Sequence, residues 1–137
     1  MVLLDANILV YYLDETADQH SDVVQKLQEL VDDQEQLIAS HHILEEVLFI
    51  VSKYDVAADL EKAVERISAI PELILIEPSP NIDFARRYAI LSKRLKMGLN
   101  DALLLQLMLD AGINQLFSYD KKFVNKANLV GIEKIIG

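Results

Sequence analysis

Three aspartates stand where a carboxylate can reach a ligand. Asp5 ends an apolar segment at the start of the chain, Asp120 closely follows a second apolar segment, and Asp101 begins a segment that is almost wholly apolar. A helix that is apolar all round is buried, so Asp101 is expected at the entrance to the core, where the helix dipole favours its ionised form. Taken alone, ordinary helix capping explains Asp101 equally well.

A fourth carboxylate comes from Glu45 or Glu46, which stand side by side in a segment of helical pattern. The residues three and four positions from Glu46 are three apolar residues and His42, whereas those around Glu45 are two histidines and two apolar residues. This pattern mildly favours Glu46 as the more buried carboxylate and Glu45 as a solvated surface charge. The spacing alone leaves the choice open.

Carboxylates brought together repel one another unless a cation neutralises them. Hard divalent cations such as Mg²⁺ and Mn²⁺ prefer oxygen ligands and keep several waters. The chain has no cysteine and only three histidines, which excludes disulfides, thiolate zinc sites, iron–sulfur clusters and a cysteine nucleophile. The residue types therefore predict an acidic metal site, without saying which reaction it performs.

Short apolar strands alternate with longer helices along the chain. Strands are expected over residues 2–5, 37–40, 73–76 and 115–118, with a weak one over 132–135, and helices over 7–13, 18–33, 42–53, 56–70, 82–97 and 101–111. The alternation is typical of βαβ units and predicts a three-layer α/β/α sandwich with a central, mostly parallel sheet of four to five strands. Ligands in such sheets bind at the carboxyl ends of the strands, where Asp5 and Asp120 fall.

The boundary between the last two predicted helices carries several local signals. The helix over residues 82–97 has an apolar stripe of Phe84, Tyr88, Leu91 and Leu95. Gly98 is expected to end this helix, and Asn100 to cap the next one, which stops at Gly112.

Chain length and net charge limit the number of domains and the kinds of partner. The 137 residues are expected to form one domain, residues 1–137, with a substantial core. The formal net charge of −9 argues against an anionic partner such as nucleic acid or an acidic membrane. The apolar opening segment lacks a basic region and contains Asp5 and Asn7, so a cytoplasmic protein with no membrane partner is expected.

Four segments match a known family in order. They are LLDANIL at residues 3–9, SHHILEEVL at 40–48, NDALL at 100–104 and SYDKKF at 118–123. With these segments the chain resembles a PIN-domain ribonuclease, particularly the small VapC-type toxins of prokaryotic toxin–antitoxin pairs. The resemblance implies a PIN-like fold, a homodimer and a small antitoxin partner that blocks the acidic site.

The resemblance also assigns residues. Asp5, Glu46, Asp101 and Asp120 correspond to the catalytic, metal-binding acids of the family, Glu46 because it directly precedes a Val-Leu pair. Asn7 and Ser118 match polar residues that orient carboxylates and water. The implied reaction is hydrolysis of an RNA phosphodiester by a water activated by one or two Mg²⁺ or Mn²⁺ ions. Lys122 stands where many relatives have another acid, which puts a second ion in doubt.

Basic residues are the candidates for RNA contact. Arg86, Arg87, Lys93, Arg94 and Lys96 are expected on the side of their helix opposite the apolar stripe, and Lys121 follows Asp120. A solvated surface is the simpler interpretation of these charges, and contact with RNA phosphates is the alternative. Because the chain stays acidic even with two bound ions, recognition of RNA is expected to be local.

Two other function classes remain open. A haloacid-dehalogenase-type phosphatase or a phospho-receiver domain also places an aspartate after the first strand, but the phosphatase pattern has a second aspartate where this chain has Asn7. The other class is a catalytically silent PIN-fold binding module. Clustered carboxylates argue against it, since a scaffold does not need them and they destabilise a metal-free fold.

Overall fold

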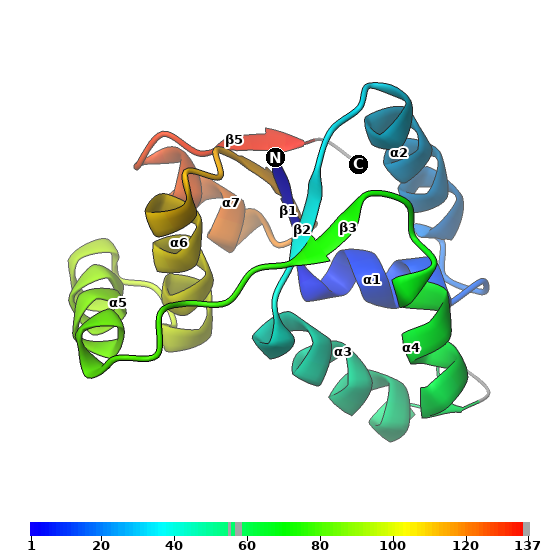
Figure 1. The fold of residues 1–137 in the computed structure, drawn as a ribbon, viewed down its shortest axis with the longest axis horizontal. Coiled ribbons are helices and arrows are strands. Elements are labelled where there is room, and N and C mark those ends of the chain that lie inside the picture. Colours follow the sequence, from blue (N-terminus) through cyan, green and yellow to red (C-terminus); the bar gives the residue numbers. More distant parts are fainter. Residues whose placement is uncertain (55, 57–58, 136–137) are drawn as a thin grey trace.

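Five short parallel strands form the centre of the computed structural model, which describes residues 1–54, 56 and 59–135 (Figure 1). They are β1 (Val2–Leu4), β2 (Leu37–Ala39), β3 (Leu73–Leu75), β4 (Gln115–Phe117) and β5 (Glu133–Ile135). Their order in the sheet is β3-β2-β1-β4-β5, and each neighbouring pair is parallel. The predicted α/β fold is confirmed, and the weak fifth strand belongs to the sheet.

The helices cover the sheet in two groups. Helices α1 (Ala6–Leu13), α2 (His20–Asp32), α3 (His41–Tyr54) and α4 (Leu60–Ser68) lie on one side, and α5 (Ile82–Leu95), α6 (Leu99–Ala111) and α7 (Lys121–Asn128) lie on the other (Figure 1). The chain leaves β1 towards β2 and β3, and later leaves β4 towards β5 on the opposite edge. The neighbours β1 and β4 therefore form a topological switch point, where open α/β sheets bind ligands.

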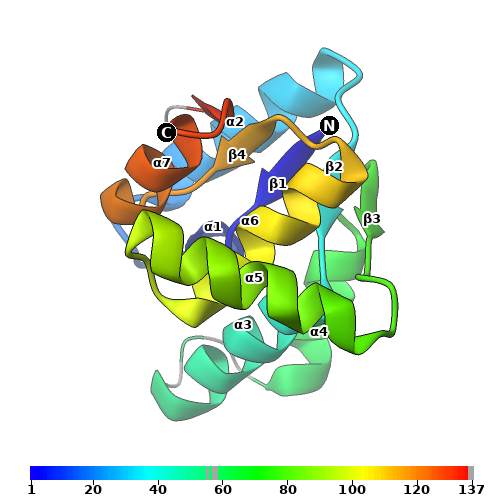
Figure 2. The same cartoon turned by 90° about the vertical axis from the view of Figure 1, so that its left-hand side faces the viewer.

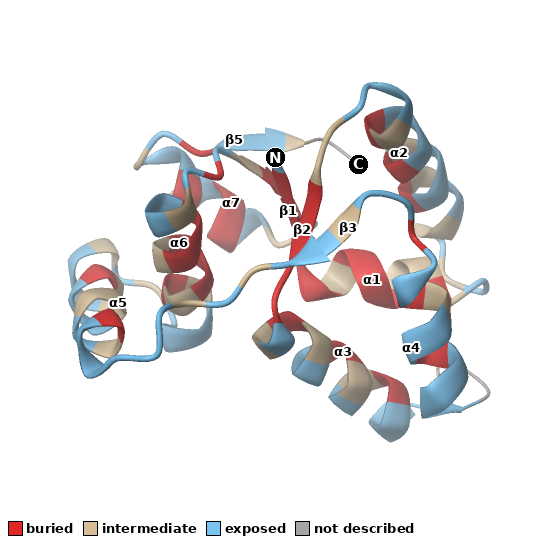
Figure 3. Cartoon of the chain, in the orientation of Figure 1, coloured by how far each residue is buried: buried red, intermediate tan, exposed pale blue. Residues whose placement is uncertain are grey.

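The core lies between the sheet and its two helical layers. All three residues of β1 and of β2 are buried, whereas the edge strand β3 is largely exposed (Figure 3). Helix α6 packs directly on the sheet and buries five side chains: Ala102, Leu104, Leu105, Leu107 and Met108. Helix α5 is outermost and lies across α6 (Figure 2). No helix in the described part of the chain is both long and apolar enough to cross a membrane.

Two predicted boundaries around α5 and α6 are wrong. Helix α5 ends at Leu95 because Lys96 adopts a left-handed conformation with φ of 55°, and the N–H of Met97 bonds back to the carbonyl of Ser92 at 3.1 Å. Gly98, expected to end α5, is instead the N-cap of α6. Asn100 therefore lies inside α6 rather than capping it, and Asp101 is still in the first turn.

Two further differences concern α4 and α7. Helix α4 begins at Leu60, where the Asp59 side chain accepts the N–H of Lys62 at 2.7 Å, and not at Val56; residues 57–58 of the predicted start lie outside the described residues. Helix α7 was not predicted at all. It is only eight residues long, but its buried residues Phe123, Val124 and Ala127 have helical spacing and Asp120 caps its start, so a local signal for this helix was present in the sequence.

Candidate metal centre

One pocket gathers four carboxylates at the switch point between β1 and β4. It has a volume of about 290 Å³ and is lined by Asp5, Ala6, Asn7, Val10, Tyr11, Glu46, Ile50, Asp101 and Asp120. Asp5 follows β1, Asp120 follows β4, Glu46 comes from α3 and Asp101 from the first turn of α6. Both sides of the sheet thus contribute side chains to the same pocket.

Asp5 is buried and held from three directions. Its Oδ1 accepts the N–H of Ala6 at 2.8 Å, so Asp5 also caps α1. Its Oδ2 accepts the hydroxyl of Ser118 at 2.6 Å and the amide Nδ2 of Asn7 at 3.3 Å. Burial raises the pKa of Asp5, the hydrogen bonds from Ser118 and Ala6 oppose that rise, and the charge of Asp120 adds to it.

Asn7 and Ser118 connect β1 to the segment after β4. The Asn7 amide donates to Ser118 Oγ at 3.2 Å, and its Oδ1 accepts the N–H of Tyr119 at 3.1 Å. Ser118 Oγ in turn accepts the N–H of Asp120 at 3.0 Å. The two residues that the sequence assigned to orienting carboxylates therefore lie between Asp5 and Asp120.

Asp120 is fixed by the helix that it starts. Its Oδ1 accepts the N–H groups of Lys122 at 3.0 Å and Phe123 at 3.2 Å. This is an ordinary N-cap, so one carboxylate both begins α7 and lines the pocket.

Asp101 has the most perturbed acid–base behaviour of the four carboxylates. Its pKa is raised from 3.8 to about 6, first by burial and then by the charges of Asp5, Asp120 and Glu46. The net effect at the start of α6 is a raised pKa, because desolvation and like charges outweigh the helix dipole that was expected to favour ionised Asp101. Burial and the charges of Asp5 and Asp120 also raise the pKa of Glu46, against the lowering effect of His42.

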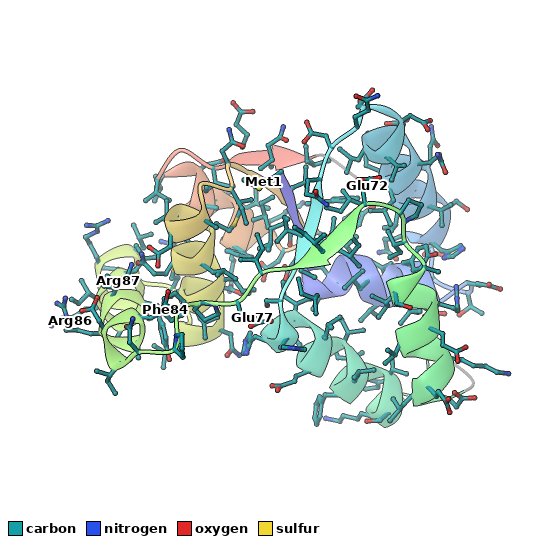
Figure 4. The ribbon with its side chains drawn as sticks, in the orientation of Figure 1. Met1, Glu72, Glu77, Phe84, Arg86 and Arg87 are labelled. Atoms are coloured by element: carbon teal, nitrogen blue, oxygen red, sulfur yellow. The ribbon has the colours of Figure 1, made fainter. Side chains whose placement is uncertain are left out.

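Glu46, and not Glu45, is the glutamate that belongs to the pocket. Both side chains are largely exposed, but burial is the first cause that raises the pKa of Glu46, in keeping with the expectation that it is the more buried of the two. The described residues that line the pocket include Glu46 and not Glu45. The start of α3 is held by Glu77, whose Oε1 accepts the N–H of His41 at 2.6 Å (Glu77 labelled in Figure 4). The buried side of α3 carries Ile43, Val47 and Val51, and at 100° per residue Glu46 lies closer to that side than Glu45 does.

The donor set suits a hard divalent cation. The ionisable groups in the pocket are carboxylates and Tyr11, with no histidine among the described lining residues, and oxygen donors are what Mg²⁺ and Mn²⁺ prefer. The carboxylates are nevertheless too far apart to form a closed ligand group: among the described residues, no three acids or histidines meet that closely. Burial and, after it, the charges of neighbouring acids raise the pKa values of Asp5, Glu46 and Asp101, and a bound cation would relieve that repulsion.

Tyr11 forms part of the pocket wall. Its ring meets Tyr119 edge-on with centroids 5.5 Å apart. The Tyr119 hydroxyl donates to Asp22 of α2, and burial together with this bond raises the pKa of Tyr119 to about 12. These contacts brace the rim of the pocket.

The basic residues of α5 lie away from the carboxylates. None of Arg86, Arg87, Lys93, Arg94 and Lys96 is among the described residues of the pocket. Arg86 and Arg87 (labelled in Figure 4) both bond to Asp83, and Arg87 also reaches Asp110 of α6 at 2.5 Å. Arg87 is half-buried at the contact between α5 and α6, so the expectation that all five lie opposite the apolar stripe is wrong. Helical geometry alone places Arg87 beside the stripe, since at 100° per residue it lies about 60° from Phe84.

Comparisons with known proteins give a family and a fold. The PIN domain family matches residues 2–129. Mycobacterium tuberculosis VapC20, a toxin that cleaves the sarcin–ricin loop, is 14% identical with a TM-score of 0.70, and the alignment covers 100% of both chains. VapBC2 from Rickettsia felis, solved with a fragment of promoter DNA, is 20% identical with a TM-score of 0.67 over 98% of both chains. No curated protein matches significantly.

Proposed function

The chain belongs to the PIN domain family, and from this premise we propose that it is a Mg²⁺- or Mn²⁺-dependent endoribonuclease that hydrolyses RNA phosphodiester bonds. The observation that carries the proposal is the single pocket lined by Asp5, Glu46, Asp101 and Asp120 at the switch point of the sheet. Family membership favours this reaction over that of a haloacid-dehalogenase-type phosphatase.

Asp5, Glu46, Asp101 and Asp120 would hold the cation. When bound, the cation lowers the pKa of a coordinated water and neutralises charge on the phosphate oxygens. Lys122, in the first turn of α7, stands where many relatives have a further acid. Whether the site holds one ion or two is an open part of the proposal. Titration of the protein with Mg²⁺ by calorimetry would give the number of ions bound.

The residues of the chain have separate tasks in this proposal. Ser118 and Asn7 orient Asp5, and the first turn of α7 orients Asp120 through its N–H groups. Asp101, whose pKa is about 6, carries a proton on part of the molecules near that pH and must release it to bind a cation. Activity is therefore expected to rise as Asp101 ionises.

A toxin role completes the proposal. VapBC2 of Rickettsia felis and VapC20 share the fold at low identity, so the role is carried by family and fold alone. We propose a small antitoxin, encoded beside this protein, that blocks the carboxylate pocket, with an arginine as the matching group. Co-expression of the adjacent reading frame tests this: a co-purifying product that inhibits RNA cleavage supports it, and a product that does neither contradicts it.

The homodimer is also a proposal. Ile82 is 89% exposed and begins α5, and Leu99 is 59% exposed and begins α6, at the opposite end of α5. Each is an exposed apolar side chain on this helical pair that a protein contact would cover. Light scattering coupled to size-exclusion chromatography measures the mass, and replacement of Ile82 and Leu99 by serine is expected to yield a monomer.

Adjacent glutamates allow a matched test of the nuclease. Glu46→Gln is expected to lose RNA cleavage in Mg²⁺ or Mn²⁺, while Glu45→Gln, which changes the same charge one residue earlier, retains it. The RNA panel includes a sarcin–ricin-loop hairpin, and a phosphomonoester and acetyl phosphate serve as the alternative substrates. Cleavage that survives a chelator, or equal loss in both variants, would contradict the proposal.

A further inference from the structure

A second pocket lies beside the carboxylate pocket, between β4, α7 and β5. Its volume is about 290 Å³, and it is lined by Ser118, Tyr119, Lys121, Val124, Asn125, Lys134 and Ile135. These described lining residues include two lysines and no carboxylate, the reverse of the neighbouring pocket with its four acids. Sequence analysis singled out Lys121 but not Lys134, which is 13 positions further along the chain and reaches the pocket only through the pairing of β5 with β4.

The two pockets share a wall. Asp120 lines the carboxylate pocket, whereas Tyr119 and Lys121, its neighbours in the chain, line the second one. Consecutive Cα atoms are only about 3.8 Å apart. Ser118 also lines the second pocket, and its hydroxyl donates to Asp5 Oδ2 at 2.6 Å. The two pockets therefore adjoin each other along residues 118–121.

The lysines of the second pocket are available to an anion. Lys121 and Lys134 are exposed, and the ion pairs among the described residues involve other cations. Asn125, one turn along α7, adds an amide donor to the same lining. The N-terminus of α7 is already capped by Asp120, so the attraction for an anion comes from these side chains.

Resting on the proposed function, we propose that the pocket of Lys121 and Lys134 binds a phosphate of the RNA strand next to the phosphate that is hydrolysed. A chain with a net charge of −9 attracts a polyanion poorly at long range, so its affinity for RNA depends on local cations. This pocket supplies such cations beside the acidic site, whereas Arg86 and Arg87 of α5 are engaged with Asp83 and Asp110. The same pocket sets which side of the cleaved bond is held.

The test measures binding without turnover. Asp101→Asn serves as the parent, and the Lys121→Gln/Lys134→Gln pair is added to it. Fluorescence anisotropy with a short single-stranded oligoribonucleotide gives Kd in Mg²⁺ over a range of salt concentrations. The added pair is expected to weaken binding roughly tenfold, as for a lost charge-assisted hydrogen bond. The slope of log K against log salt should fall in magnitude by about 0.7, the value for one phosphate contact on a single strand.

A matched control removes the same charge elsewhere. Lys62→Gln/Lys126→Gln, on α4 and α7, changes two lysines that line neither pocket, and it should leave Kd and the salt slope of the parent unchanged. If both pairs of substitutions weaken RNA binding equally, the effect comes from the change in net charge, and the inference is overturned. Thermal melting of each variant verifies that the fold is intact.

Inorganic phosphate separates the two sources of the anion. Thermal melting in phosphate shows whether the free anion stabilises the protein. If the Lys121→Gln/Lys134→Gln pair loses this stabilisation while its RNA affinity is unchanged, the pocket is a site for a free anion, and the assignment to RNA is overturned. A parent that binds no RNA overturns it as well. RNA binding is measured in a variant that does not cleave RNA. If the unaltered protein does not cleave RNA either, the proposed nuclease activity is refuted, but the binding data still test whether the lysines hold a phosphate.

Discussion

Ser118 donates its hydroxyl to Oδ2 of Asp5 at 2.6 Å, across 113 positions of sequence. The bond is buried, and it opposes the rise in the pKa of Asp5 that burial causes. It also joins the carboxyl ends of β1 and β4, because Ser118 directly follows β4 and Asp5 directly follows β1. The ionisation of one acid at the switch point thus depends on a hydroxyl from the neighbouring strand.

Ser118→Ala is expected to weaken Mg²⁺ binding by about 10- to 100-fold, the usual effect of removing a group that orients a metal ligand. The physical reason is that Asp5 loses a donor to Oδ2 and its pKa rises further. Isothermal titration calorimetry measures the affinity. Ser118→Thr keeps the hydroxyl and should restore most of it. Unchanged affinity in the alanine variant would argue against this role.

Asp5→Asn and Asp101→Asn are each expected to abolish metal-dependent RNA cleavage while the fold survives. Each variant removes one negative ligand from the proposed cation site, and an amide binds a hard cation less strongly. Gel assays of cleavage measure the loss, and circular dichroism confirms the fold. If either variant retains full activity, the assignment of these acids as metal ligands is contradicted.

The metal-free protein is expected to lose stability as pH rises through the pKa of Asp101. This carboxyl has a folded-state pKa of about 6, above its ordinary value of 3.8, so the protonated form is favoured by folding. The contribution is present below about pH 4 and is lost between about pH 4 and pH 6. A rise of this size corresponds to at most about 3 kcal/mol, and solvent contact of the half-buried group reduces it to about 1–2 kcal/mol.

Denaturant titrations at several pH values check this prediction. Asp101→Asn should unfold at higher denaturant concentration than the unaltered chain above pH 6 in the absence of metal, since it removes a repelled charge. Near pH 4 the two proteins should converge. If the difference in stability between Asp101→Asn and the unaltered chain grows as pH falls, its sign is opposite to the one expected, and the raised pKa of Asp101 is contradicted.

Mg²⁺ is expected to raise the melting temperature at neutral pH. Ligand that binds only the folded state stabilises it by about 2.7 kcal/mol when its free concentration is about 100 times Kd. The rise should be smaller in Asp101→Asn and intact in Glu45→Gln, whose side chain lies outside the described lining of the pocket. Differential scanning calorimetry at matched ionic strength measures it, and equal shifts in all three proteins would point to a non-specific salt effect.

Arg87→Ala should lower the melting temperature more than Arg86→Ala. Both arginines bond to Asp83, but only Arg87 also reaches Asp110 and so joins α5 to α6. Asp110→Asn is the reciprocal variant and should reproduce the loss seen with Arg87→Ala. If Arg86→Ala is equally destabilising, the contact of Arg87 with Asp110 does not stabilise the protein by joining α5 to α6.

The sequence by itself determined the fold class and the edge of the sheet where the acids gather. Apolar strand segments and the stripe of α5 are local patterns, so they are visible without tertiary contacts. Asp5 and Asp120 each follow a strand, and parallel strands end at the same edge, so these two positions could be placed in advance. Helix α7 was missed although its buried residues Phe123, Val124 and Ala127 have helical spacing, because it is only eight residues long.

Only the tertiary structure decided how the acids ionise and what lies beside them. Glu46 was already the choice from the sequence, through the Val-Leu pair that follows it, and the structure has Glu46 in the lining of the pocket. The pKa of Asp101 depends on desolvation and on charges from Asp5 and Glu46, more than 50 positions away. Lys134 reaches Lys121 only through strand pairing. Such long-range packing and desolvation leave no local pattern in the chain.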